Sequence, residues 1–412
     1  MTGREQESRM NRGWDWWATI AAFVLALLMI VAATQLHAQT FTVLHSFGTY
    51  PDGYEPLAGV TMDSHGNLYG ITTFGGENSF GIAFKLAPHG ANWVYSKLYD
   101  FNATSGYIPV AKLAIGRDGS LYGTATSGGA YEYDGTVFNL RPSPTVCRAT
   151  ACPWQATVIH NFDGYDGSYP TTMNFDSAGN ILGTTFQGGA VGVGVVYRLA
   201  PANGSWNFSM LSDFSGSQVS EPNGGVIADQ DGNLYGTALG SYPGTVFQLT
   251  TSGAVNILHQ FGSGGGTGLD PFDGLISDSA GNLYGLTAYE GPRGGGTVFE
   301  LSPSGGNWTF NTLYGLTGGI WNGTVGTASL AMDAQGNLYG TTPGNGAHGH
   351  GSVFKLTPSQ NGWIFTDLYD FTGGDDGCGP WTDVSIDQLG NLYGTASECG
   401  QNGGGTIWEI TP

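Results

Sequence analysis

Acidic residues recur in short segments that end in proline, and they have the clearest chemical potential in this sequence. They are Glu55, Asp166, Glu221, Asp270 and Asp376. Two carboxylates that face one bond can act as acid and as base or nucleophile in glycosidic cleavage, and a ring of them can hold a cation or sugar hydroxyls. Each segment also has a structural interpretation, because proline fixes φ where a chain enters a strand. We interpret a single copy as a turn and treat the set as candidate ligand-binding residues.

Two tryptophans stand out beside these segments. Trp381 follows one of the prolines, and Trp321 lies in the equivalent segment of the preceding copy, where the other copies carry small or aliphatic residues. Aromatic rings next to carboxylates suit the apolar faces of sugars. The alternative is that both rings pack inside the fold.

Other sequence motifs do not indicate a catalytic or metal-binding site. The sequence contains no Gly-x-Ser-x-Gly, His-Glu-x-x-His or Cys-x-x-Cys pattern. The segment that begins at Asp229 resembles the start of a calcium loop but has Leu234 where glycine is required. His348 and His350 lie in a glycine-rich stretch without an evident third ligand. We therefore predict no metal and no cofactor, and we assign no catalytic residue.

A repeat must position these side chains. The segment Asp-Ala-Gln-Gly-Asn-Leu-Tyr-Gly-Thr, at 333–341, returns in seven copies at intervals of about 54 residues. A period of this size built from strands indicates a solenoid or a propeller. In the first copy we expect strands over 57–62, 67–73, 81–86 and 93–101, here called A to D, with tight turns at Asp-x-x-Gly-Asn.

The two ends of the chain distinguish a ring from an open solenoid. The seventh copy stops at Pro412 after strand C, and residues 39–47 match the missing strand D. An N-terminal strand that pairs with the last copy removes the exposed sheet edges. The sequence thus predicts an all-β, seven-bladed propeller of four-stranded antiparallel blades over 39–412, closed by the strand 39–47.

Alternating strand direction assigns the loops to two faces. The D–A and B–C loops share one face, and the A–B and C–D turns share the other. Cys378 and Cys399 fall in a D–A and a B–C loop, whereas Cys147 and Cys152 share one long C–D loop. We predict the disulfides Cys147–Cys152 and Cys378–Cys399.

The repeat resembles the bacterial tandem-repeat family often labelled GloVer-type, or choice-of-anchor. The resemblance is carried by Asn-Leu-Tyr-Gly-Thr at 337–341, Gly-Thr-Val-Phe-Glu-Leu-Ser-Pro at 296–303 and Leu-Tyr-Asp-Phe at 98–101. It covers the whole chain after the N-terminal segment. The resemblance implies an exported, propeller-like protein.

Composition and the N-terminus bear on location and partners. The formal net charge is −20, which disfavours nucleic acid and anionic lipid as partners. Residues 1–38 combine Arg4, Arg9 and Arg12 with an apolar run at 16–33, as in a secretory signal cleaved after Ala38, and an uncleaved run would anchor the chain in a membrane. We expect an exported monomer in the periplasm, at the cell surface or in the medium.

Two functions remain open on the sequence alone. The first is a binding or scaffold module that recognises carbohydrate or an extracellular protein on the D–A/B–C face. The second is a carbohydrate-active enzyme, a hydrolase or lyase, that uses Glu55, Asp166, Glu221 or Asp270. Because these acids recur as one set of turn residues rather than as a distinctive pair, the first function is favoured. A purely structural surface protein is not separated from it.

Overall fold

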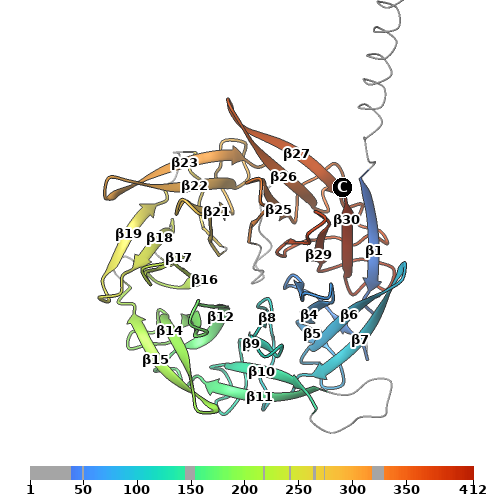
Figure 1. Cartoon of the computed structure of the whole chain (residues 1–412), viewed down its shortest axis with the longest axis horizontal. Coiled ribbons are helices and arrows are strands. Elements are labelled where there is room, and N and C mark those ends of the chain that lie inside the picture. Colours follow the sequence, from blue (N-terminus) through green and yellow to red (C-terminus); the bar gives the residue numbers. More distant parts are fainter. Residues whose placement is uncertain are drawn as a thin grey trace, which may run out of the picture. The chain divides into compact units, whose positions relative to one another are not determined.

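The computed structural model describes residues 39–48, 51–143, 154–216, 219–240, 243–262, 266–272, 274–317 and 329–412. Residues from Phe41 to Ile410 form one compact unit. It contains seven four-stranded antiparallel sheets that follow one another around a central axis (Figure 1). No helix within the described residues has the length and apolar character needed to cross a membrane. The limits 1–38 and 39–412 stay predictions.

Each blade runs from an inner strand next to the axis to an outer strand at the rim (Figure 1). The inner strands A are β3 (Thr61–Met62), β8 (Ala114–Ile115), β12 (Ser168–Phe175), β16 (Pro222–Ala228), β20 (Ile276–Ser277), β24 (Ala331–Met332) and β28 (Ser385–Ile386). Strands B are β4 (Leu68–Thr72), β9 (Leu121–Ala125), β13 (Ile181–Gln187), β17 (Leu234–Ala238), β21 (Leu283–Thr287), β25 (Leu338–Thr342) and β29 (Leu392–Ala396).

In most blades the two outer positions hold longer strands than the inner ones. Strands C are β6 (Ile82–His89), β10 (Thr136–Pro142), β14 (Val195–Ala202), β18 (Thr245–Leu249), β22 (Thr297–Ser304), β26 (Ser352–Ser359) and β30 (Thr406–Thr411). Strands D are β7 (Asn92–Asp100), β11 (Trp154–Asn161), β15 (Ser205–Asp213), β19 (Val255–Gln260), β23 (Asn307–Gly315), β27 (Gly362–Asp370) and β1 (Thr40–Ser46). A short extra pair, β2 (Gly53–Tyr54) and β5 (Phe74–Gly75), joins loops at the first blade.

The repeated Leu-Tyr-Gly-Thr segment holds each blade together, as the sixth blade illustrates. The Tyr339 hydroxyl donates to Asp333 Oδ2 at 2.9 Å and so ties strand B to the A–B turn. A Cβ on Gly340 would come within 2.6 Å of Phe354 Cζ, so only glycine lets this strand C ring lie over strand B. Thr341 Oγ1 donates to the Thr382 carbonyl of the next blade at 3.0 Å. One motif therefore provides a turn, a packing surface and a link between blades.

The inner strands are shorter than expected in most blades. The sequence predicted a first strand over 57–62, whereas β3 contains only Thr61 and Met62. The carbonyls of Pro56 and Ala58 accept hydrogen bonds from Thr395 Oγ1 of the neighbouring blade, at 2.9 and 3.1 Å. This part of the chain thus bonds to the adjacent blade and not to a strand of its own sheet.

The ring closes as the sequence predicted. Strand β1 lies beside β30 at the outer edge of the seventh blade, in the order β1-β30-β29-β28 (Figure 1, blue beside red). Phe47 and the loop before β30 exchange backbone hydrogen bonds, from Phe47 N to Gly405 O at 2.9 Å and from Gly404 N to Phe47 O at 3.1 Å. Phe47 is fully buried between the seventh and first blades, in one apolar cluster with Val60, Phe84 and other residues.

Candidate functional site

The D–A loops share a backbone arrangement that explains their Pro-terminated pattern. The residue before each proline adopts a left-handed conformation, with φ of 55° at Glu55, 56° at Glu221 and 53° at Asp270. Its N–H donates to a B–C loop of the preceding blade, as from Glu221 N to Val193 O at 2.8 Å. Its carbonyl accepts from its own blade, as from Leu239 N at 3.2 Å. These residues therefore join adjacent blades through the backbone, whatever their side chains bind.

Asp166 and Asp376 lie at the outer end of their loops. Asp166 Oδ2 is 2.8 Å from Nε2 of His160, which belongs to the outer strand β11. Asp376 Oδ2 accepts hydrogen bonds from the Tyr369 hydroxyl at 2.9 Å and from Thr372 N at 2.7 Å. Burial alone would raise the pKa of Asp376, but the hydrogen bonds from Thr372 and Tyr369 outweigh it and lower that pKa. Both carboxylates are engaged in holding turns, and their role in ligand binding stays a prediction.

Glu55 and Asp270 each have a second acid beside them. Burial raises the pKa of Glu55, and the charge of Glu398 raises it further. Burial also raises the pKa of Asp270, and the charge of Glu290 raises it further. A carboxyl group with a raised pKa keeps its proton to higher pH, which is the property required of a general acid.

Of the predicted tryptophans, Trp381 is described and Trp321 lies outside the described residues. Trp381 is half-buried and lines a pocket of about 270 Å³ on the D–A/B–C side, together with His350 and Glu398. Cys378 and Cys399 form a disulfide at this pocket. Because Glu398 also lies near Glu55, the structure brings two predicted residues, Glu55 and Trp381, toward one acidic neighbour. Glu221, Asp166 and Asp270 belong to other loops, and Cys147 and Cys152 lie outside the described residues.

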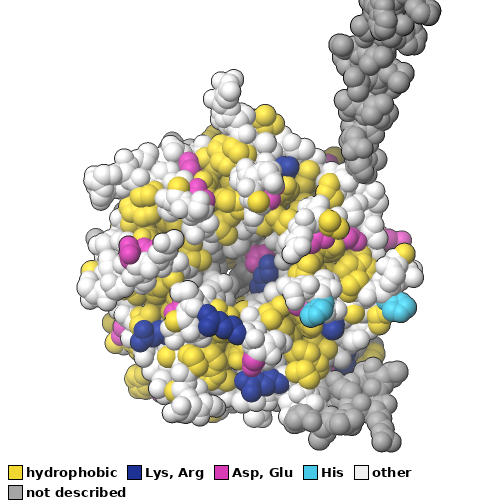
Figure 2. All heavy atoms as spheres, viewed as in Figure 1, with side chains coloured by type: hydrophobic (Ala, Val, Ile, Leu, Met, Phe, Trp, Pro, Cys, Tyr) yellow, Lys and Arg dark blue, Asp and Glu magenta, His cyan; other side chains and the backbone are white. Residues whose placement is uncertain are grey.

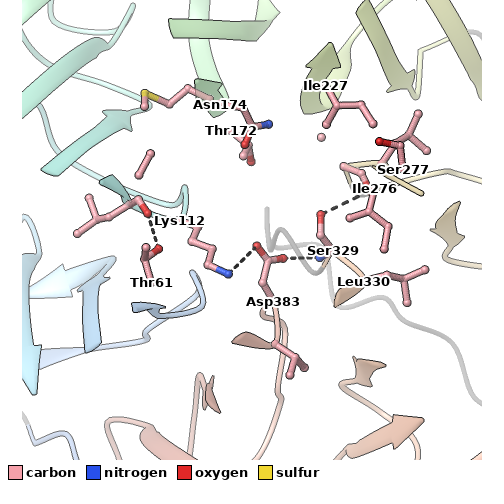
Figure 3. Close-up of a pocket in the computed structure, with 17 residues that line it drawn as sticks. Thr61, Lys112, Thr172, Asn174, Ile227, Ile276, Ser277, Ser329, Leu330 and Asp383 are labelled. Atoms are coloured by element: carbon pink, nitrogen blue, oxygen red, sulfur yellow. Dashed lines mark hydrogen bonds and ion pairs between the residues drawn. The ribbon is translucent and has the colours of Figure 1, made fainter. Parts of the chain in front are cut away.

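A second cavity, of about 490 Å³, lies at the centre of the ring among the inner strands. Figure 2 shows the ring hollowed at its middle, with basic and acidic side chains beside the opening. Lys112 and Asp383 point toward one another inside this cavity, with Nζ 3.8 Å from Oδ2 (Figure 3). Lys112 Nζ also donates to Ser385 Oγ at 3.0 Å, and the other Asp383 oxygen accepts from Ser329 N. Burial raises the pKa of Asp383, while Lys112 and the Ser329 N–H act in the opposite direction.

The ion pair between Lys112 and Asp383 was not predicted from the sequence, although the repeat pattern contains an indication of it. The predicted acids precede the prolines of their segments, whereas Lys112 and Asp383 follow Pro109 and Pro380 and lie just before β8 and β28 at the central cavity. Lys112 and Asp383 occupy the same position of the repeat, two residues before the inner-strand residue that pairs with the repeated tyrosine. Comparing that single position across the copies would have revealed two charged residues among small ones.

No group of three or more His, Cys, Asp or Glu side chains suited to a metal ion occurs within the part of the chain that the structure describes. There are carboxyl pairs and one tryptophan at the loop face, and one ammonium–carboxylate pair in the central cavity.

Seven sheets around an axis, closed by the first strand, define a seven-bladed β-propeller. The fold is similar to that of a virginiamycin B lyase from Staphylococcus aureus, at 12% identity over 91% of this chain and 99% of the other, with a TM-score of 0.54. It is also similar to a streptogramin B lyase, at 11% identity over 90% and 97% of the two chains, with a TM-score of 0.55. These identities establish a common fold and nothing finer.

The chain belongs to the Gloeobacter/Verrucomicrobia repeat family, which matches residues 31–238, 144–331 and 238–412. The resemblance stated on sequence grounds is thereby confirmed. A search of curated proteins found no match to this sequence.

Proposed function

We propose that the protein is an exported binding module that recognises carbohydrate on its D–A/B–C face. The observation that carries this proposal is the pocket at Trp381, where a half-buried indole lies beside Glu398 and His350. An aromatic surface next to hydrogen-bonding groups suits a sugar ring, which has an apolar face and hydroxyls at its edge. The disulfide between Cys378 and Cys399 keeps the two loops together before a ligand arrives.

Export is part of the same proposal. The N-terminal segment 1–38 has the sequence pattern of a secretory signal, and the Cys378–Cys399 disulfide suits an oxidising compartment. The periplasm, the cell surface and the medium all fit these two features.

A glycan and polysaccharide screen tests the binding role. We expect retention on at least one neutral glycan, and we expect Trp381→Ala to reduce its affinity roughly tenfold or more, because the stacking surface is lost. Trp363→Ala is the matched control, since this tryptophan lies at the start of the outer strand β27. Retention that survives Trp381→Ala, or is lost equally in the control at equal folding, would contradict the site.

The second candidate is a carbohydrate-active enzyme, and the raised pKa of Glu55 beside Glu398 favours it. The same screen decides between the two functions when released products are scored as well as retention. Product release that disappears in Glu55→Gln would identify a hydrolase or lyase and replace the binding-only proposal. Product release lost instead in Glu221→Ala or Asp270→Asn would move the reacting group to another loop.

A further inference from the structure

One repeat position, within or just before the inner strand, carries a charged residue in only two blades. Counted two residues before the partner of the repeated tyrosine (Leu182 in the third blade), the seven copies hold Gly59, Lys112, Thr172, Gly225, Gly274, Ser329 and Asp383. Five blades are built with glycine or a small hydroxyl residue here. The blade architecture therefore does not require charge at this position, and the two charged residues call for another explanation.

Lys112 and Asp383 belong to the second and seventh blades and meet across the first. The first blade has Gly59 there, where a Cβ would come within 2.5 Å of the Asp383 carbonyl oxygen. The ammonium and the carboxylate nevertheless remain 3.8 Å apart, which is beyond hydrogen-bond distance. Among the described residues, Lys112 donates one hydrogen bond, to Ser385, out of the three that an ammonium can make. Each charge thus keeps bonding capacity that faces the cavity.

The other walls of the cavity are mainly apolar. Ile227 and Ile276 line it away from Lys112 and Asp383 (Figure 3). Thr172 also faces the cavity, and its Oγ1 is buried without a hydrogen-bond partner among the described residues. No aromatic ring is found among the described residues that line this space, so it lacks the stacking surface that favours a pyranose. Its volume of about 490 Å³ is within the range of small-molecule sites.

We propose that the central cavity binds a small zwitterion of the α-amino-acid class. The ligand carboxylate would pair with Lys112, its ammonium with Asp383, and an aliphatic side chain would contact Ile227 and Ile276. An α-amino acid carries both charges on one carbon, which matches two protein charges that lie side by side. It is neutral overall, so the net charge of −20 does not repel it as it would an anion. This proposal is independent of the carbohydrate pocket at Trp381.

Titration calorimetry with L-leucine tests the proposal on the unmodified protein. Leucine methyl ester lacks the carboxylate, and N-acetylleucine lacks the ammonium. We expect leucine to bind and each analogue to bind at least roughly tenfold more weakly, because one charge-assisted contact is missing. If none of the twenty amino acids binds, or if the analogues bind as well as leucine, the proposal is overturned.

Variants then assign the two contacts. Lys112→Met should weaken leucine binding at least roughly tenfold and remove the difference between leucine and its methyl ester. Asp383→Asn should remove the difference between leucine and N-acetylleucine. Lys97→Met is the matched control, because Lys97 forms a 2.8 Å ion pair with Asp100 on the outer strand β7 and should leave leucine binding unchanged.

The outcomes separate this site from the loop-face pocket and from a structural role. Trp381→Ala should leave leucine binding intact, and Lys112→Met should leave glycan retention intact. If both central variants lower the melting temperature while leucine binds each of them as it binds the parent, the ion pair only links blades, and the proposal fails.

Discussion

At the scale of single residues, the aspartate of the A–B turn accepts several hydrogen bonds at once. Asp333 Oδ1 accepts from the backbone N–H groups of Gln335 and Asn337, both at 2.9 Å. Its Oδ2 accepts from Asn337 Nδ2 at 2.6 Å and from the Tyr339 hydroxyl. Burial alone would raise the pKa of Asp333, but the hydrogen bonds from Asn337 and Tyr339 outweigh it and lower the pKa. The same direction holds at Asp63, Asp229 and Asp278.

The lowered pKa of these aspartates predicts how the free energy of unfolding depends on pH. A carboxyl group whose folded pKa lies below its unfolded value of about 3.9 stabilises the fold above that value, and the contribution is lost as the pH falls through the folded pKa. We expect Asp333→Asn to lower the free energy of unfolding by about 1 kcal/mol at pH 7, and the difference from the parent to shrink below about pH 4.

Denaturant unfolding at several pH values measures this difference. Asp231→Asn serves as the control, because Asp231 is an exposed residue of another A–B turn and should change stability little at any pH. A constant difference between Asp333→Asn and the parent from pH 7 to pH 3 would contradict the assignment of the network to the ionised carboxylate.

At the scale of strands, each blade depends on a glycine of strand B under an aromatic ring of strand C. The pairs recur around the ring, as Gly70 with Phe84, Gly285 with Phe299 and Gly394 with Trp408. A Cβ at these glycines would come within 2.3 to 2.5 Å of ring carbons. Conformational freedom is not the reason for glycine here. Space is the reason, because the ring fills the position of the missing side chain.

Gly340→Ala tests this packing in the sixth blade. The added methyl group would displace the fully buried Phe354, and we expect a loss of about 1–3 kcal/mol in the free energy of unfolding. Gly262→Ala is the control, because no atom of the described residues lies within 4 Å of a Cβ there, and it should change stability by less than about 0.5 kcal/mol. A double-mutant cycle with Phe354→Ala should give clearly non-additive losses, and additive losses would exclude direct contact.

Some features of the strands can be predicted from a single sequence, and others cannot. The turn at Asp333, the strand order and the closing strand at 39–47 are predictable, because each depends on residues repeated at a constant spacing. The short inner strand β3 is not, because its preceding residues bond to Thr395, which is distant in sequence and belongs to another blade. The repeat itself shows that Lys112 and Asp383 are charged at one shared position, but their pairing joins the second blade to the seventh and can be inferred only when the ring is closed.

At the scale of the whole propeller, stability depends on the closure of the ring, where β1 pairs with β30. Strand β1 and the residue after it contribute packing on both sides: Phe41 stacks on Tyr369 of the sixth blade at 3.7 Å between centroids, and Phe47, directly after β1, lies 5.2 Å from Phe84 of the first blade. The same strand covers the edge of β30, which would otherwise present unpaired backbone groups. Closure therefore combines two effects, apolar packing and protection of a sheet edge, and these can be separated by experiment.

Removal of residues 39–47 should lower the melting temperature and cause self-association, since both effects are lost together. Phe47→Ala should lose about 3–5 kcal/mol of packing yet remain monomeric, because the backbone pairing with Gly405 persists.

A permuted chain that carries residues 39–47 after Pro412, joined by a turn like that between Ser359 and Gly362, should recover both properties, because it recreates the C–D connection of the other blades. Calorimetry measures the first property and light scattering the second. A truncated protein that melts like the parent and stays monomeric would mean that the strand is not what closes the ring.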